Sequence, residues 1–176
     1  TVLRDQGVEV LVAKTIDDLE SVARPDALLL VAATENIRDE ALWARLASAP
    51  GDRLVIEPTA AGRAELTPDI RLTEGSIPDE RPDCALREAD RAGDIRIWTA
   101  DTYDSAGDVP LTRCYGGAVA RYSAQGRTIT VVGTADFMTN GSLDKDGNAA
   151  LAMNLAGARD RLIWFAPQEI QGDSAL

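Results

Sequence analysis

Two short apolar runs without polar alternation set the strongest limit on what this chain can fold into. The first spans residues 27–33. The second covers residues 128–132, is rich in β-branched side chains and is closed by Gly133. Strands covered on both faces have this composition, and they occur almost only in parallel sheets with helices on either side. The chain therefore predicts an α/β fold with a mostly parallel central sheet.

Helical segments alternate with these strands. Apolar residues recur at helical spacing over 38–47, and small residues with two leucines four apart fill 148–156. Strand–helix–strand order with short turns favours right-handed crossovers and a three-layer sandwich. The C-terminal half adds an expected antiparallel meander over 111–115, 118–123 and 128–132. The remaining expected strands are 8–12, 53–56, 95–99 and 161–165, the remaining helices are 16–23 and 59–66, and 67–93 is a long polar excursion.

A polar loop separates the strand at 128–132 from the helix at 148–156. In open α/β sheets, ligands bind in the loops that follow the carboxyl ends of strands. The helix would be capped by Asn148, whose side chain can accept from free N–H groups of the first turn, and Gly157 would end it in a left-handed conformation. The candidate ligand-binding residues of this loop are Thr134, Asp136, Asn140 and Asn148.

Asp144 and Asp146 are weaker candidates, for a Ca²⁺ or Mg²⁺ site. Their spacing does not match a calcium-binding loop, and Lys145 between them opposes a bound cation. Turn formation by Asp and Asn side chains is the simpler interpretation. No cofactor is predicted.

Charge and composition exclude several classes of function. The formal net charge of −11 over 176 residues disfavours nucleic acid as a partner, since that requires clustered Lys and Arg. The absence of histidine removes Ser-His-Asp and Cys-His catalysis. After the strand at 53–56, where a nucleophile elbow would lie, the chain reads Glu57-Pro58-Thr59, with neither Cys nor Ser. These absences favour binding over catalysis.

Cys84 and Cys114 are the two cysteines of the chain. A single pair predicts a disulfide and an oxidising compartment, with two unrelated buried thiols as the alternative. Residues 1–6 read as the end of a helix stopped by Gly7, which suggests a domain excised from a longer protein. Residues 1–176 are expected to form one domain.

Three segments resemble the family known as domain of unknown function 4350. They are Val131-Val-Gly-Thr-Ala-Asp-Phe-Met-Thr-Asn140 with Asp146-Gly-Asn-Ala-Ala-Leu-Ala-Met-Asn-Leu155, then Arg161-Leu-Ile-Trp-Phe-Ala-Pro167, and the opening Leu3-Arg-Asp-Gln-Gly-Val-Glu-Val10. Asp136, Asn140 and Asn148 match polar positions of that family.

The resemblance implies a bacterial membrane protein that holds this domain outside the cytoplasm, anchored by transmembrane segments beyond this chain. It also implies a fold similar to class I glutamine amidotransferases and flavodoxins. Family members are often encoded beside MoxR-type AAA ATPases, which suggests a part in envelope assembly; no activity is established for them.

The sequence therefore leads to one main hypothesis and one alternative. The main hypothesis is a non-catalytic, extracytoplasmic domain that binds a protein partner or a small ligand at the cell envelope. The alternative is a hydrolase or transferase that uses carboxylates or a divalent metal ion in the 134–148 loop.

Overall fold

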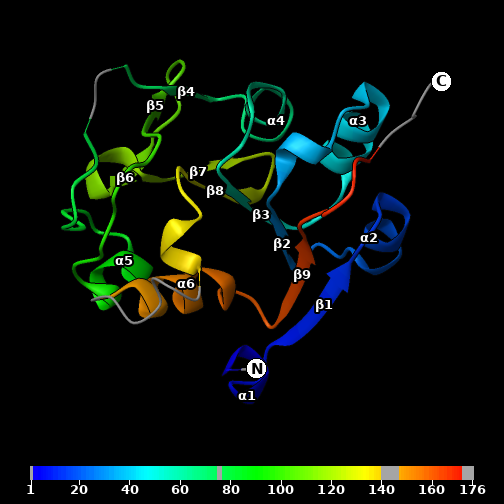
Figure 1. Ribbon diagram of the computed structural model, residues 1–176, viewed down its shortest axis with the longest axis horizontal. Helices are drawn as coiled ribbons and strands as arrows, with labels where there is room; N and C mark the ends of the chain where they lie inside the picture. The colour runs from blue at the N-terminus through cyan, green and yellow to red at the C-terminus, as the bar shows by residue number, and fades with distance from the viewer. Residues whose placement is uncertain (1, 75–76, 140–146, 172–176) are drawn as a thin grey trace.

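A seven-stranded mixed sheet forms the centre of the molecule. The computed structural model describes residues 2–74, 77–139 and 147–171 (Figure 1). The strand order is β1-β9-β2-β3-β8-β7-β6, and the first five strands are parallel. The bounds of these five are β1 (Glu9–Ala13), β9 (Arg161–Phe165), β2 (Leu28–Val31), β3 (Asp52–Ile56) and β8 (Arg127–Val132). The predicted mostly parallel α/β sheet is confirmed.

The predicted antiparallel meander is also confirmed. It consists of β6 (Thr112–Cys114), β7 (Val119–Ala124) and β8, with β7 antiparallel to both neighbours. Ala124 pairs with Arg127, so the hairpin between β7 and β8 turns through Gln125 and Gly126, at φ 52° and 74°. Positive φ at both positions is the signature of a two-residue type I′ turn.

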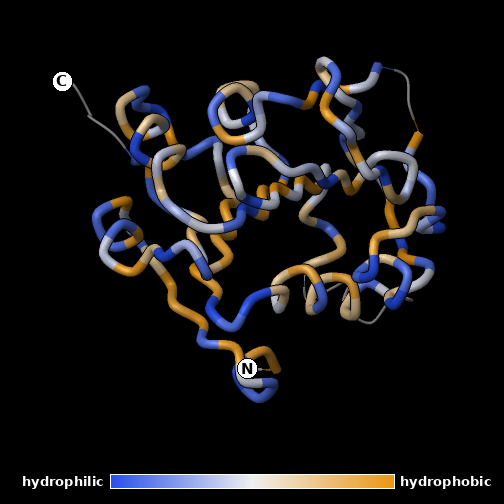
Figure 2. The backbone as a smooth tube through the Cα atoms, turned by 180° about the vertical axis from the view of Figure 1, so that it is seen from behind, coloured by the Kyte–Doolittle hydropathy of each residue, from blue (hydrophilic) through white to orange (hydrophobic). Residues whose placement is uncertain are grey.

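Helices cover both faces of the sheet (Figure 1). The first face carries α2 (Ile16–Val22), α3 (Glu40–Ser48) and α4 (Ala60–Leu66), and the second carries α5 (Arg87–Ala92) and α6 (Asn148–Ala156). Leu29 and Val31 point to the first face, whereas Leu28 and Leu30 point to the second, and all four are buried. Hydrophobic residues accordingly concentrate along the central strands (Figure 2).

A small second sheet covers β7 and β8 on the α4 side. It pairs β4 (Ile70–Leu72) with β5 (Tyr103–Ser105) in antiparallel fashion, and Tyr103 and Ile70 pack on Tyr122, Ile129 and Val131. The other short elements are α1 (Val2–Asp5) and the 3₁₀ turns η1 (Thr34–Asn36), η2 (Tyr115–Gly117) and η3 (Asp136–Met138).

Two local expectations are wrong. Residues 95–99 form no strand. Their burial alternates as in a strand, since Ile95 and Ile97 are buried and the residues between and after them are exposed. However, the Ile95 amide donates to the Glu80 carbonyl and no ladder of strand hydrogen bonds forms. Residues 95–99 thus have the apolar–polar alternation of a strand, but Ile95 and Ile97 pack in the core without pairing with a neighbouring strand. Gly157 has φ −92° and so does not end α6 in a left-handed conformation.

The predicted disulfide is present. The Cys84 and Cys114 Sγ atoms lie 2.03 Å apart, and the bridge ties the 77–86 segment to the end of β6. With a sequence separation of 30, the loop it closes contributes roughly 3–4 kcal/mol in the chain-entropy model.

Arginines at the amino ends of the strands satisfy the carbonyl groups at the ends of three helices. Arg161 donates to Val22 of α2 at 3.1 Å, Arg127 to Ala49 after α3 at 3.0 Å, and Arg53 both to Leu66 of α4 at 2.9 Å and to Ala47 of α3. The last carbonyls of a helix lack intrahelical donors and carry partial negative charge, so cations there are stabilising. Arg53 is 5% exposed, and burial together with nearby Arg127 lowers the pKa of its guanidinium to about 10.

Replacing Arg53 tests this arrangement. We expect Arg53→Met to lower the free energy of unfolding by about 2–3 kcal/mol, because the carbonyls of Ala47 and Leu66 lose their donor in a buried site. Urea unfolding at pH 7 measures the change. The control is Arg87→Met, an exposed residue of α5, expected to change stability by less than about 0.5 kcal/mol. Equal losses in the two variants would contradict the assignment.

Candidate functional site

The loops after three neighbouring parallel strands are tied together at one end of the sheet. The Glu57 amide, just after β3, donates to the Val132 carbonyl at the end of β8, at 2.7 Å. The Thr59 amide donates to the buried Thr34 hydroxyl in η1, after β2, at 2.9 Å. The carboxyl ends of β2, β3 and β8 thus form one connected surface.

Glu57 occupies a sharp turn between β3 and α4. Its φ of 50° is left-handed, a conformation that costs a non-glycine residue about 1–2 kcal/mol. Thr59 caps α4 by accepting from the Gly62 amide at 3.2 Å, and only three residues separate the end of β3 from the start of the helix. The sequence suggests an empty elbow here because it offers no Cys or Ser, but the fold presents a carboxylate at that position.

Three further carboxylates act on Glu57. Although Glu57 is exposed overall, partial burial of its carboxyl group, followed by the charges of Asp136, Asp101 and Glu35, raises its pKa above the ordinary value of 4.5. All three neighbours are themselves exposed. The surface therefore concentrates negative charge at the carboxyl ends of the strands and keeps a proton on Glu57 to higher pH than usual.

Asp101 reaches this surface because Gly133 has no side chain. A Cβ on Gly133 would lie 1.7 Å from the Asp101 carbonyl oxygen, closer than any real contact. The two backbones are joined by a hydrogen bond from the Asp101 amide to the Gly133 carbonyl, at 2.9 Å. The segment before β5 is thus pressed onto the end of β8, which places a carboxylate beside Glu57 from a distant part of the sequence.

Tyr103 adds an unusual polar group beneath the acidic surface. Its side chain is fully buried, and its hydroxyl has no hydrogen-bond partner within the described residues. Burial raises the pKa of this hydroxyl, and the charges that act on it are those of Asp101, Arg63 and Glu57. A buried hydroxyl without a partner is costly, and such groups occur where a water or a ligand completes the network.

Of the candidate ligand and metal residues predicted in the 134–148 loop, the structure describes only some. Thr134 and Asp136 follow β8 directly, with the Thr134 hydroxyl accepting from the Asp136 amide at 3.1 Å; Thr134 is buried, and Asp136 is exposed beside Glu57. Asn140, Asp144 and Asp146 lie outside the described residues.

The capping role predicted for Asn148 is wrong. Gly147 is the N-cap of α6 and Asn148 is its first helical residue. The fully buried Asn148 side chain instead holds the backbone of Arg96, accepting from its amide at 2.8 Å and donating to its carbonyl at 3.3 Å. These two hydrogen bonds fix the backbone at Arg96 against the start of α6.

Within the described ranges, no group of three or more acidic or cysteine side chains is arranged to hold a metal ion. The site residues that sequence reasoning missed are Glu57, Asp101, Glu35 and Tyr103. Glu57 carried a local signal, since a charged residue between a buried strand and a Pro-Thr helix start is out of place in a simple turn. Asp101 and Tyr103 carried none.

Comparison with known proteins identifies the family. The family model described as "Domain of unknown function (DUF4350)" matches residues 1–156. The chain is 56% identical over 173 residues to "Uncharacterized membrane protein Rv3691" of Mycobacterium tuberculosis. The chain belongs to the DUF4350 family. That alignment covers 98% of this chain but 45% of the relative, so the chain spans less than half of that protein.

One solved structure has a low similarity to this DUF4350 chain. It is the β-galactosidase from the psychrophilic Marinomonas ef1, with a TM-score of 0.41 and 18% identity over 74% of this chain and 20% of that enzyme. The family relative is named as a membrane protein. In the part of the DUF4350 chain that the structure describes, no helix has the length and apolar character to cross a membrane.

The electrostatics of Glu57 predict a pH-dependent effect of its removal. Because its folded pKa is raised, its contribution to stability is complete below the unfolded pKa and is lost as pH rises through the folded pKa. We therefore expect Glu57→Gln to raise the free energy of unfolding above that of the wild type at pH 7, and to raise it less at pH 4. The difference stays below about 1 kcal/mol because the group is exposed. Urea unfolding of both proteins at the two pH values measures the difference.

The matched control is Glu65→Gln, an exposed residue of α4 whose charge is not among those that act on Glu57. The same pH dependence in both variants would show that Glu57 has no special environment.

Proposed function

We propose that this domain is a non-catalytic, extracytoplasmic part of a membrane-anchored protein, and that it binds a protein partner or small ligand at the cell envelope. The observation that carries the proposal is Glu57, held in a left-handed conformation at the end of β3 among Asp136, Asp101 and Glu35. Strain and mutual repulsion at one surface cost stability, and natural proteins retain such costs chiefly where the surface has a function.

The architecture supports this choice of surface. The finer proposal for the fold is the class I glutamine amidotransferase or flavodoxin-like type, in which ligands bind at the carboxyl ends of the strands. In such a fold the turn after β3 would hold the nucleophile of an enzyme. Here it holds Glu57, and the chain has no histidine to activate a nucleophile, so a binding role suits the site better.

The disulfide supports the extracytoplasmic side. Stable disulfides form mainly in oxidising compartments, and Cys84 and Cys114 are bridged in the fold. We expect protein isolated from its own cells, with thiols blocked at lysis, to carry no label on either cysteine unless a reductant is added first. Mass spectrometry of the labelled peptides measures this. Two labelled thiols in the unreduced sample would contradict the extracytoplasmic placement.

Binding is tested with the full-length protein in its own membranes. We expect molecules that co-purify with the wild type in mild detergent to be reduced at least about tenfold in Glu57→Gln and Asp136→Asn variants, the scale of losing one charged hydrogen bond. Quantitative mass spectrometry of proteins and extracted small molecules makes the comparison. The Arg87→Gln variant, changed at an exposed residue of α5, is expected to retain them.

An equal yield of every co-purifying molecule in all variants would contradict a binding role for this surface. The raised pKa of Glu57 also favours a second candidate, a hydrolase or transferase with Glu57 as general acid. Turnover of a glycoside, ester or amide substrate that is lost in Glu57→Gln would replace the binding proposal with this one.

A further inference from the structure

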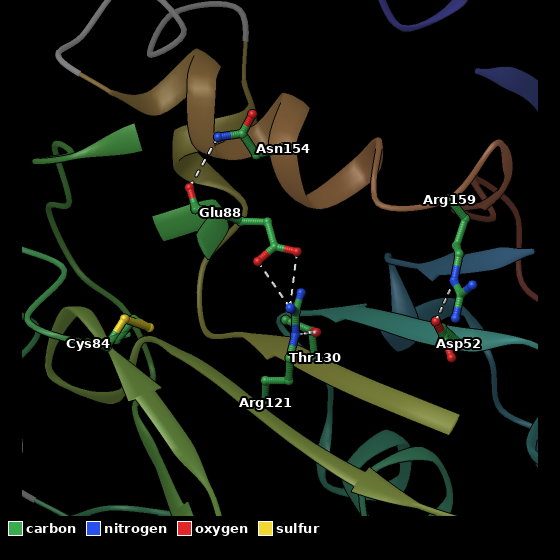
Figure 3. Close-up of polar contacts among 8 residues, drawn as sticks. Asp52, Cys84, Glu88, Arg121, Thr130, Asn154 and Arg159 are labelled. Atoms are coloured by element: carbon green, nitrogen blue, oxygen red, sulfur yellow. Dashed lines mark hydrogen bonds and ion pairs between the residues drawn. A yellow bond between two sulfur atoms is a disulfide. The ribbon is translucent and has the colours of Figure 1, made fainter. Parts of the chain in front are cut away.

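A second polar site lies at the opposite ends of the strands from Glu57. A cavity of about 210 Å³ opens where β2, β3 and β8 begin and α6 ends, and its polar lining includes Asp52, Glu88, Arg121, Thr130 and Arg159. Figure 3 shows these side chains in two separate groups, with Glu88, Arg121 and Thr130 in one and Asp52 and Arg159 in the other. No residue of this site takes part in the surface described above.

Arg121 is fixed on one side of the cavity. From β7, its Nε donates to the Thr130 hydroxyl at 2.8 Å, and its Nη1 donates to the two Glu88 carboxylate oxygens at 3.0 and 3.1 Å (Figure 3). The Arg121 and Glu88 side chains are only 21% and 18% exposed. Asn154 of α6 donates to the Glu88 carbonyl at 3.1 Å, which also fixes the backbone that carries the carboxylate.

Arg159 and Asp52 form a matching pair on the other side. The Arg159 Nε donates to one Asp52 carboxylate oxygen at 2.9 Å, and the other oxygen accepts from the Thr128 amide at 2.9 Å (Figure 3). The Asp52 side chain is 13% exposed and that of Arg159 is 46% exposed. Each arginine is thus oriented by a carboxylate that is itself held in place, as in preorganised binding sites.

The balance of donors and acceptors in this cavity is uneven. Each guanidinium has five N–H groups. Among the described residues, the two N–H groups on Arg121 Nη2 and the four on Arg159 Nη1 and Nη2 have no acceptor, while both carboxylates already accept. The buried Thr130 hydroxyl accepts from Arg121, and its own hydrogen has no acceptor in this part of the chain.

The simpler interpretation is that these ion pairs only hold α5 and the segment after α6 against the sheet, with water on the remaining donors. That role accounts for Nε and Nη1 of Arg121 and for Nε of Arg159. It does not explain why two guanidinium groups from distant segments, each with N–H groups that lack an acceptor among the described residues, line one cavity. An acceptor-rich, anionic group is the chemical complement of such a site.

We propose that this cavity binds the phosphate group of a small phosphorylated molecule. A carboxylate offers two oxygens, whereas a phosphate monoester offers three terminal oxygens of higher charge, which better match several N–H donors from two planar guanidinium groups. The cavity also exceeds the space a phosphate group needs, which leaves room for a small organic substituent.

Nuclear magnetic resonance titration of the domain tests the proposal. Glycerol 3-phosphate, inorganic phosphate, acetate and glycerol are added separately at pH 7, with ionic strength held constant by sodium chloride. We expect saturable shifts of the Arg121, Thr128, Thr130 and Arg159 amides, strongest for glycerol 3-phosphate, weaker for inorganic phosphate and negligible for acetate and glycerol. Tighter binding of inorganic phosphate than of the ester would overturn the assignment to a phosphorylated molecule.

Arg159 is the residue to change, because it is half-exposed and its loss leaves Arg121 and Glu88 paired. We expect Arg159→Gln to weaken glycerol 3-phosphate binding at least about tenfold, with Arg159→Lys intermediate because it keeps the charge and loses the planar fork. Arg87→Gln, at an exposed residue of α5, is the control expected to keep binding unchanged. Matched thermal unfolding verifies that all variants remain folded.

Two results would overturn the proposal. One is the absence of any saturable shift with either phosphate compound. The other is equal binding by wild type and a folded Arg159→Gln variant, which would show that the anion binds elsewhere. Both leave the proposed function untouched, because Glu57 and its neighbours lie at the other ends of the strands.

Discussion

The helix C-termini at the amino ends of the parallel strands impose the constraint on which the charge distribution of this fold depends. Because each crossover helix runs antiparallel to its strands, its last carbonyls arrive at that edge without intrahelical donors. Arg161, Arg127 and Arg53 supply the donors for α2, α3 and α4. Arg53 stands on β3, the middle strand of the sheet, and connects the ends of two helices to it.

The same geometry explains the acidic surface at the other edge. Helix N-termini collect there, and their free N–H groups and positive partial charge favour carboxylates and hydroxyls. Thr59, Thr15 and Asp39 accept from the first turns of α4, α2 and α3. Glu57, Asp101 and Asp136 exceed what capping requires, since the charges of Asp101 and Asp136 act on Glu57 and none of the three side chains caps a helix among the described residues. That excess distinguishes a site from an ordinary helix start.

Sequence reasoning recovered what local pattern determines. The unalternated runs 27–33 and 128–132 became β2 and β8, and the two cysteines became a bridge. Its predictions were wrong or missing where the local structure depends on contacts with residues distant in the sequence. Residues 95–99 alternate like a strand, but their backbone is held by Glu80 and by the Asn148 side chain, 52 positions from Arg96. Glu57 follows a predicted strand, but the approach of Asp101 to it depends on the segment before β5 being pressed onto Gly133, which the local sequence does not indicate.

The separation of charge between the two edges also bears on what each could bind. A domain of net charge −11 repels anions at long range, so an anion is held only where donors are fixed and partly shielded from water. Arg121, 21% exposed and paired with Glu88, meets that condition. At the carboxyl edge, Glu57, Asp136, Asp101 and Glu35 bring exposed negative charges together, which favours cationic groups. The direction of the strands and helices thus accounts for the arginines at one edge of the sheet and for the capping hydroxyls and carboxylates at the other.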